Sequence, residues 1–153
     1  MACVELFAAY GVPLTPRDTR LKSPQDLVYS GVMGFVGRGL VGTCVLIGEV
    51  APLEASCPDG GRLRDWVGEL ANQLVGRLKV KLLGRGLPVV LSTPLVFSSV
   101  RIEPMPRGNL KPAAFDTPRG TIVVWVEVEA DEKVALDSER PSGVGTEGDI
   151  LIF

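Results

Sequence analysis

Apolar residues recur every three or four positions between Arg62 and Leu83, which is the pattern of a helix with one buried face. At about 100° per residue, these apolar positions fall on one broad stripe. The stripe consists of Leu63, Val67, Leu70, Ala71, Leu74 and Leu78. The opposite stripe, within an arc of about 60°, carries Asp65, Glu69, Asn72 and Gly76. We therefore expect a long central helix that presents two carboxylates, an amide and a gap along one exposed edge.

Gly76 is the least expected residue on this edge, because glycine costs a helix about 1 kcal/mol relative to alanine. One explanation is that a partner approaches the helix closely at this position. The alternative is that the whole edge is the solvated face of an ordinary amphipathic helix.

Shorter apolar runs on both sides of the central helix predict one short helix and several strands. The expected helix is Val4–Tyr10, which would end at Gly11. The expected strands are Leu27–Val36, Leu40–Val50, a bent or double strand over Val89–Ile102 interrupted by Pro94, Thr121–Ala130, and a short final strand over Ile150–Phe153. The predicted fold class is α/β or α+β: a single domain over residues 1–153, with a mostly antiparallel sheet and the central helix packed on one face.

Four segments are predicted as loops, the first of them alternatively as an irregular extended stretch, because proline, glycine and polar residues interrupt the apolar pattern there. They are residues 11–26, 51–61, 103–120 and 131–149, the last of which is expected to be mobile. Within residues 51–61, Pro52 is expected to stop any helix early. Asp59 or one of the following glycines is expected to cap the central helix.

Composition narrows the function. Of the 153 residues, 46% are hydrophobic and 22% charged, and the net charge is −2. These values are typical of a soluble globular domain and give no reason to expect a nucleic acid or an anionic membrane as partner. Residues 31–50 are apolar over the length of a membrane span, but Arg38 and the Val and Ile content favour a hairpin.

Two residue types restrict the chemistry further. The absence of histidine excludes Ser-His and Cys-His nucleophile pairs and every His-ligated metal site. The three cysteines, Cys3, Cys44 and Cys57, are widely spaced, as expected for reduced thiols in a cytoplasmic protein. The first residues do not resemble a signal peptide.

Two motifs have ordinary structural explanations. Residues 37–42 spell G-x-G-x-x-G, but a dinucleotide site needs a helix to begin inside this motif. The residues that follow, from Thr43 to Ile47, favour a strand, so a hairpin turn is the better prediction. Asp65 and Glu69 have the spacing of a chelating pair, but without histidine or a third ligand we expect no metal on this chain.

The central helix also carries a resemblance. Asp65, Glu69 four residues later, Asn72 three residues after that, and Pro94 further along the chain resemble the signature of the CheC/CheX/FliY chemotaxis phosphatases. Residues 32–46 are similar to the glycine-rich hairpin that precedes this helix in CheX-like proteins. A single signature helix is closer to CheX than to CheC. The chain departs from CheX at residues 51–61, where such proteins usually carry a second long helix.

The resemblance implies a phosphatase that hydrolyses the aspartyl phosphate of a receiver domain such as that of the response regulator CheY. It implies that Glu69 and Asn72 are the catalytic residues and that Asp65 and Gly76 help the substrate to dock. Asn72 would orient the attacking water, and Glu69 would form an ion pair with a receiver-domain lysine. The Mg²⁺ would belong to the receiver domain, so the chain itself would need no cofactor.

CheX-like proteins pair as dimers, so the resemblance also implies a homodimer. The apolar strands support this expectation, because they offer more sheet than one helix can cover. Two other functions remain open. The same fold could serve as a non-enzymatic adaptor that binds a receiver domain or a motility complex, or as a structural module unrelated to phosphate.

Overall fold

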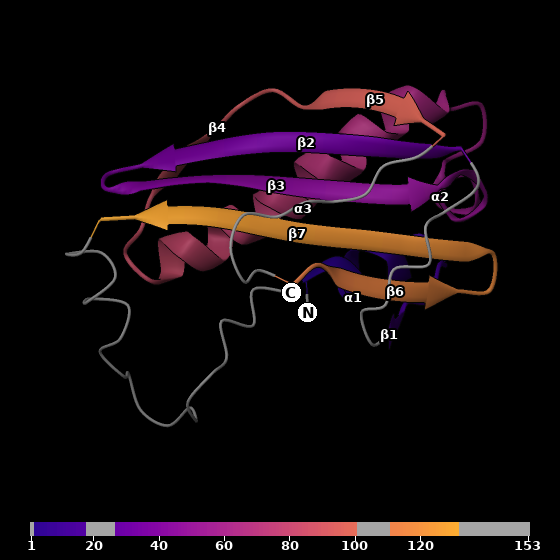
Figure 1. Ribbon diagram of the computed structural model, residues 1–153, viewed down its shortest axis with the longest axis horizontal. Coiled ribbons are helices and arrows are strands. Elements are labelled where there is room, and N and C mark those ends of the chain that lie inside the picture. The colour runs from indigo at the N-terminus through magenta and orange to yellow at the C-terminus, as the bar shows by residue number, and fades with distance from the viewer. Residues whose placement is uncertain (1, 18–26, 101–110, 132–153) are drawn as a thin grey trace.

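The computed structural model describes residues 2–17, 27–100 and 111–131. These residues form three helices and one seven-stranded sheet in which every pairing is antiparallel. The elements are α1 (Ala2–Ala8), β1 (Thr15–Arg17), β2 (Val28–Gly37), β3 (Leu40–Glu49), α2 (Val50–Ser56), α3 (Leu63–Gly84), β4 (Val89–Leu91), β5 (Leu95–Ser99), β6 (Ala113–Thr117) and β7 (Gly120–Ala130). The strand order is β1-β6-β7-β3-β2-β4, and β5 pairs with the other end of β2 (Figure 1). The predicted fold class is confirmed.

The hairpin of β2 and β3 forms the centre of the sheet. Its turn consists of Arg38 and Gly39, between the paired residues Gly37 and Leu40. Gly39 has φ +70°, a left-handed conformation that favours glycine and is typical of tight hairpin turns. The G-x-G-x-x-G motif therefore crosses a hairpin, and no helix begins inside it, as the sequence predicts.

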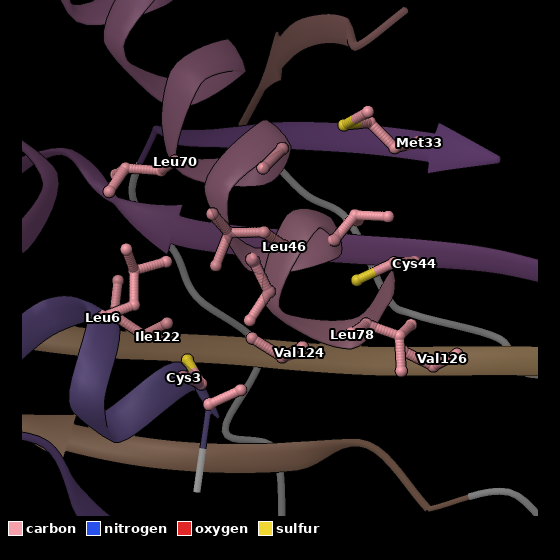
Figure 2. Packing of buried hydrophobic residues seen from close by; sticks show 14 of the residues in the cluster. Cys3, Leu6, Met33, Cys44, Leu46, Leu70, Leu78, Ile122, Val124 and Val126 are labelled. Carbon is pink, nitrogen blue, oxygen red and sulfur yellow. The ribbon is translucent and has the colours of Figure 1, made fainter. Parts of the chain in front are cut away.

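All three helices cover the same face of the sheet. In Figure 1 this face points away from the viewer, and α3 runs behind β2, β3 and β7. Alternate residues of the strands point toward the helices and pack with the apolar stripe of α3, which forms the main core. Figure 2 shows side chains of this core, among them Met33, Cys44, Leu46, Leu70, Leu78, Ile122, Val124 and Val126.

The opposite face of the sheet has a smaller apolar cluster of its own. Its buried members are Val28, Val45, Ile47, Ala114 and Val123. Apolar side chains therefore point to both faces, which is why the central strands have nearly continuous apolar sequences instead of a strict alternation.

Helix α2 is the largest difference from the sequence prediction, which treated residues 51–61 as a loop. Pro52 lies at the third position of this helix. The first N–H groups of a helix have no partner within it, so a proline there sacrifices no hydrogen bond. The expected cap of α3 is also wrong: Arg62 is the N-cap, and it makes no side-chain capping bond.

The sequence predicts neither β1 nor β6 as a strand: the segment with β1 is expected to be a loop or an irregular extended stretch, and the segment with β6 a loop. The two strands are only three and five residues long, too short to produce a recognisable alternation, and they pair with each other at one edge of the sheet. An ion pair of 3.1 Å between Arg17 Nη1 and Asp116 Oδ1 joins them. The predicted loops at 18–26, 103–110 and 132–149 and the predicted strand at 150–153 lie outside the described residues.

The other elements agree with the predictions to within two or three residues. Helix α1 begins at Ala2 and ends at Ala8, before Gly11 with φ +74°. Strands β4 and β5 are the predicted double strand, interrupted at Pro94. None of the helices in the described ranges combines the length and the apolar character that crossing a bilayer would require.

We expect Cys57 alone to react rapidly with a thiol reagent in the native protein, and Cys3 and Cys44 to react only after unfolding. Burial raises the pKa of both Cys3 and Cys44 to about 12, so neither supplies the reactive thiolate. Burial also raises the pKa of Cys57, but this residue is only half-buried and the reagent can reach it. Reagent titration with and without urea measures the difference, and three fast thiols in the native protein would contradict it.

The same thiols should make stability depend on pH. Their folded pKa lies above the unfolded value of about 9, so the unfolded chain loses these protons first as the pH rises. The contribution of the protonated Cys3 and Cys44 thiols to the free energy of unfolding is therefore complete below pH 9 and is lost as the pH approaches 12.

Candidate functional site

An open pocket of about 610 Å³ lies between the first turns of α3 and the chain that links β4 to β5. One wall comes from the helix and the other from the interruption of the predicted double strand. The lining residues are Arg64, Asp65, Gly68, Glu69, Asn72, Ser92, Thr93, Pro94, Leu95 and Val96. The pocket thus brings together Asp65, Glu69, Asn72 and Pro94, the four residues that carry the resemblance.

Helix α3 presents its polar edge to this pocket because its apolar stripe is buried against β2. Asp65, Glu69 and Asn72 are exposed, as the sequence predicts, while Leu70 and Leu74 are buried at 0% and 3% exposure. One face of α3 therefore packs in the core and fixes the helix, and the other face is exposed to solvent beside Pro94.

Gly68 lets α3 approach the second wall of the pocket. A Cβ atom at this position would lie 3.3 Å from Val96 Cγ2, a tight contact, and 3.7 Å from Pro94 Cγ, an ordinary one, so the backbone of α3 passes close to the second wall. Gly68 and Val96 both line the pocket, so this close contact between α3 and β5 forms part of its surface.

Ser92 attaches the second wall to the centre of the sheet. Its backbone N–H donates to the Gly34 carbonyl at 2.9 Å, and its Oγ accepts a hydrogen bond from the Gly34 N–H at 2.9 Å. The Ser92 Oγ also donates to the carbonyl of Thr93 at 3.0 Å. These bonds fix the position of the chain just before Pro94. Both walls of the pocket are therefore attached to β2.

Glu69 has a hydrogen-bond partner on its own helix. Gln73 Nε2 donates to Glu69 Oε1 at 2.8 Å. Among the described residues, no group of three or more His, Cys, Asp or Glu side chains is arranged to hold a metal ion.

Gly76 lies one turn beyond Asn72 and does not line the pocket. A Cβ atom at this position would meet nothing within 4 Å, so packing within the chain does not require glycine here. The chain itself therefore gives no packing reason for glycine at this position. Close approach by a partner stays a proposal, and an ordinary solvated helix face stays the alternative.

Gly76→Ala is expected to raise the free energy of unfolding by about 0.5–1 kcal/mol, because alanine favours the helix and has room. Urea unfolding measures this effect, and Gly84→Ala at the helix end, also in open space, is the matched comparison. If a partner does approach at Gly76, this variant should bind it more weakly than Gly84→Ala does. Equal binding by the two variants would argue against a docking role for Gly76.

Several lining residues were not predicted from the sequence. Ser92 and Thr93 precede Pro94 in a short interruption between two apolar runs, and this position at the end of a strand was the available signal. Gly68 and Arg64 gave no signal, because helical spacing alone does not show which part of another element lies beside a helix.

Comparison with known proteins identifies the fold. No protein-family model and no curated protein matches this sequence. Solved structures do match. A CheC-like superfamily protein from Shewanella sp. PV-4 superposes with a TM-score of 0.70 at 20% identity, over 84% of this chain and 93% of that one.

Two CheX structures are also similar. The chemotaxis protein CheX from Vibrio vulnificus has a TM-score of 0.65 at 21% identity, over 83% of this chain and 96% of that chain. A chain of the CheX–CheY–BeF3–Mg²⁺ complex from Borrelia burgdorferi has a TM-score of 0.53 at 13% identity, over 84% and 96%. The chain therefore has the fold of the CheC-like and CheX proteins.

Proposed function

We propose that this protein hydrolyses the aspartyl phosphate of a CheY-like receiver domain, and that Glu69 and Asn72 are the functional residues of this reaction. The observation that supports this most strongly is the pocket, which gathers Asp65, Glu69, Asn72 and Pro94 at one open surface. The fold supports it as well, because one structure of the same fold is a CheX in complex with CheY.

The chemistry suits the residues present. An acyl phosphate is already activated, so its hydrolysis needs a water molecule placed in line and compensation of charge more than it needs a strong base. An amide such as that of Asn72 does not titrate, yet it can hold a water by hydrogen bonds, as a glutamine does in small GTPases. The lack of histidine is therefore no obstacle to this reaction.

Glu69 is proposed to fix the position of the partner. Its exposed carboxylate, one turn from Asn72, can form an ion pair with a lysine of the receiver domain and so set the docking register. Asp65 and Gly76 are proposed to support the same docking. The Mg²⁺ that screens the phosphoryl charge would be held by the receiver domain.

The shape of the pocket fits a macromolecular substrate. It is open and lies on the surface between a helix and an edge strand, and the exposed side chain of Leu95 stands at its rim. A surface of this kind admits the phosphorylated face of another domain more readily than it would enclose a small molecule.

We also propose a two-fold homodimer. Within the described residues β4 and β5 pair only with β2 and so form an edge of the sheet, at the top of Figure 1. Phe97 and Val90 on these strands are 41% and 70% exposed, and an apolar edge of this kind favours pairing. Light scattering at tens of micromolar should give twice the mass of the chain, and a monomer mass would contradict the proposal.

The test of the activity is the decay rate of a panel of receiver domains phosphorylated with acetyl phosphate in the presence of Mg²⁺. The proposal expects at least one member to lose its phosphoryl group faster when this protein is added. Binding without faster decay would support the adaptor function instead. If no receiver domain of the panel binds this protein and none loses its phosphoryl group faster, the proposal is overturned.

A further inference from the structure

We propose that Gln73 and Tyr10 are positioning residues that hold the Glu69 carboxylate in its docking orientation. This inference rests on the proposed function, because it assigns the two residues a role in recognising the receiver domain. It adds a feature that the signature residues do not contain: a hydrogen-bonded relay that runs from helix α3 to the turn after helix α1.

The relay has two bonds and one direction. Tyr10 OH donates to Gln73 Oε1 at 2.9 Å, and Gln73 Nε2 donates to Glu69 Oε1 at 2.8 Å. An ionised carboxylate only accepts hydrogen bonds, so the NH2 group of Gln73 must face Glu69. The amide oxygen of Gln73 then faces Tyr10, whose hydroxyl can only act as the donor.

The relay is more than a surface pair at i, i+4 spacing, which by itself contributes little to holding a side chain. Gln73 is half-buried, and Tyr10 lies 63 positions away in sequence. The ring of Tyr10 packs edge-on against Trp66, with 4.8 Å between the centroids and an interplanar angle of 86°. Trp66 is only 8% exposed and so is held in the core. Its contact therefore restricts the movement of the Tyr10 ring.

Trp66 is itself fixed by hydrogen bonds. Its Nε1 donates to the buried Ser56 Oγ at 2.9 Å, and that hydroxyl donates to the carbonyl of Leu53 at 2.8 Å. The chain of contacts from α2 through Trp66 and Tyr10 to Gln73 therefore ends at one oxygen of the exposed Glu69. The other carboxylate oxygen can still accept from a cationic group of the partner.

The physical benefit is preorganisation. A long exposed side chain loses rotamer freedom when it binds, and a side chain that is already held loses less. Loss of the relay should therefore weaken docking about two- to tenfold, the effect of ordering one flexible side chain. It should not slow the chemical step, because neither Gln73 nor Tyr10 lines the pocket.

The experiment uses Gln73→Met, which keeps the length of the side chain but not the amide, and Tyr10→Phe, which keeps the ring against Trp66. KM and kcat are measured with the receiver domain that the wild type dephosphorylates, and the dissociation constant for that domain is measured in parallel. We expect a raised KM and dissociation constant at unchanged kcat, more for Gln73→Met than for Tyr10→Phe. Lys79 is exposed on the same helix, so Lys79→Met is the matched control. It should leave KM, kcat and the dissociation constant unchanged.

A second comparison separates positioning from simple destabilisation. In a Glu69→Ala background, Gln73→Met should have no further effect on binding, because the group it positions is gone. An unchanged dissociation constant for Gln73→Met, or effects of the two substitutions that multiply, would overturn the relay while leaving the proposed function intact. A wild type that neither binds nor dephosphorylates any receiver domain would overturn the proposed function itself, and with it the docking role of the relay.

Discussion

Asn72→Ala is expected to reduce kcat for receiver-domain dephosphorylation by about 10²–10³, the usual effect of removing one positioned hydrogen-bonding group at a reacting centre. The amide is proposed to touch the attacking water, so the loss should fall on kcat more than on KM. Initial rates of phosphate release over a range of receiver-domain concentrations separate the two parameters.

Folding should not account for this loss. Asn72 is exposed and its side chain is not part of the core, so the free energy of unfolding should change by about 0.5 kcal/mol or less. Lys79→Ala, exposed further along the same helix, serves as the control and should retain full activity. Full activity of Asn72→Ala toward a receiver domain that the wild type dephosphorylates would rule out the mechanism proposed for this residue.

Glu69→Ala should behave differently from Asn72→Ala. If the ion pair to the receiver lysine forms equally in the ground and transition states, its loss raises KM and leaves kcat nearly unchanged. An adaptor would lose binding with the same substitution but would have no hydrolytic activity to lose. The pair of variants therefore distinguishes the two functions.

The sequence predicted the central helix well because its periodicity extends over six turns, and tertiary packing reinforces a pattern of that length. It also predicted which face is buried: Leu70, Leu74 and Leu78 are in the core and Glu69 and Asn72 are exposed. Short elements were harder to predict. Helix α2 was missed because Pro52 was treated as a helix breaker, although its place in the first turn is one that proline tolerates.

The candidate site could be predicted only in part, since a helical pattern lists the residues of one edge without showing what lies opposite. Asp65, Glu69 and Asn72 follow from helical spacing, whereas Ser92 and Thr93 reach the pocket through the pairing of β4 and β5 with β2. Such pairing joins positions far apart in sequence and leaves no local signal. The role proposed for Gln73 could not be predicted for the same reason, because its hydrogen-bond partner Tyr10 is far away in the sequence.

Gly31→Ala is expected to lower the free energy of unfolding by about 1–3 kcal/mol, the usual cost of forcing extra volume into a well-packed core. A Cβ atom at Gly31 would lie 2.8 Å from Ala71 Cβ and 3.1 Å from the backbone oxygen of Val67. Both contacts belong to α3, and a backbone atom cannot rotate away as a long side chain can. The helix would have to move off the sheet, and urea unfolding should show an earlier midpoint.

The same displacement should affect the candidate site, because one wall of the pocket is α3 and the other is attached to β2, the strand that carries Gly31. Gly34→Ala is the matched control on that strand: its Cβ would meet its nearest neighbours, the Gly42 carbonyl oxygen and Ser92 Oγ, both at 3.7 Å, an ordinary contact distance. Neither glycine has a positive φ, so the two variants differ in the space around the new methyl group and not in backbone strain. An unchanged unfolding midpoint for Gly31→Ala, or an equal loss for both variants, would show that this close contact does not set the position of the helix.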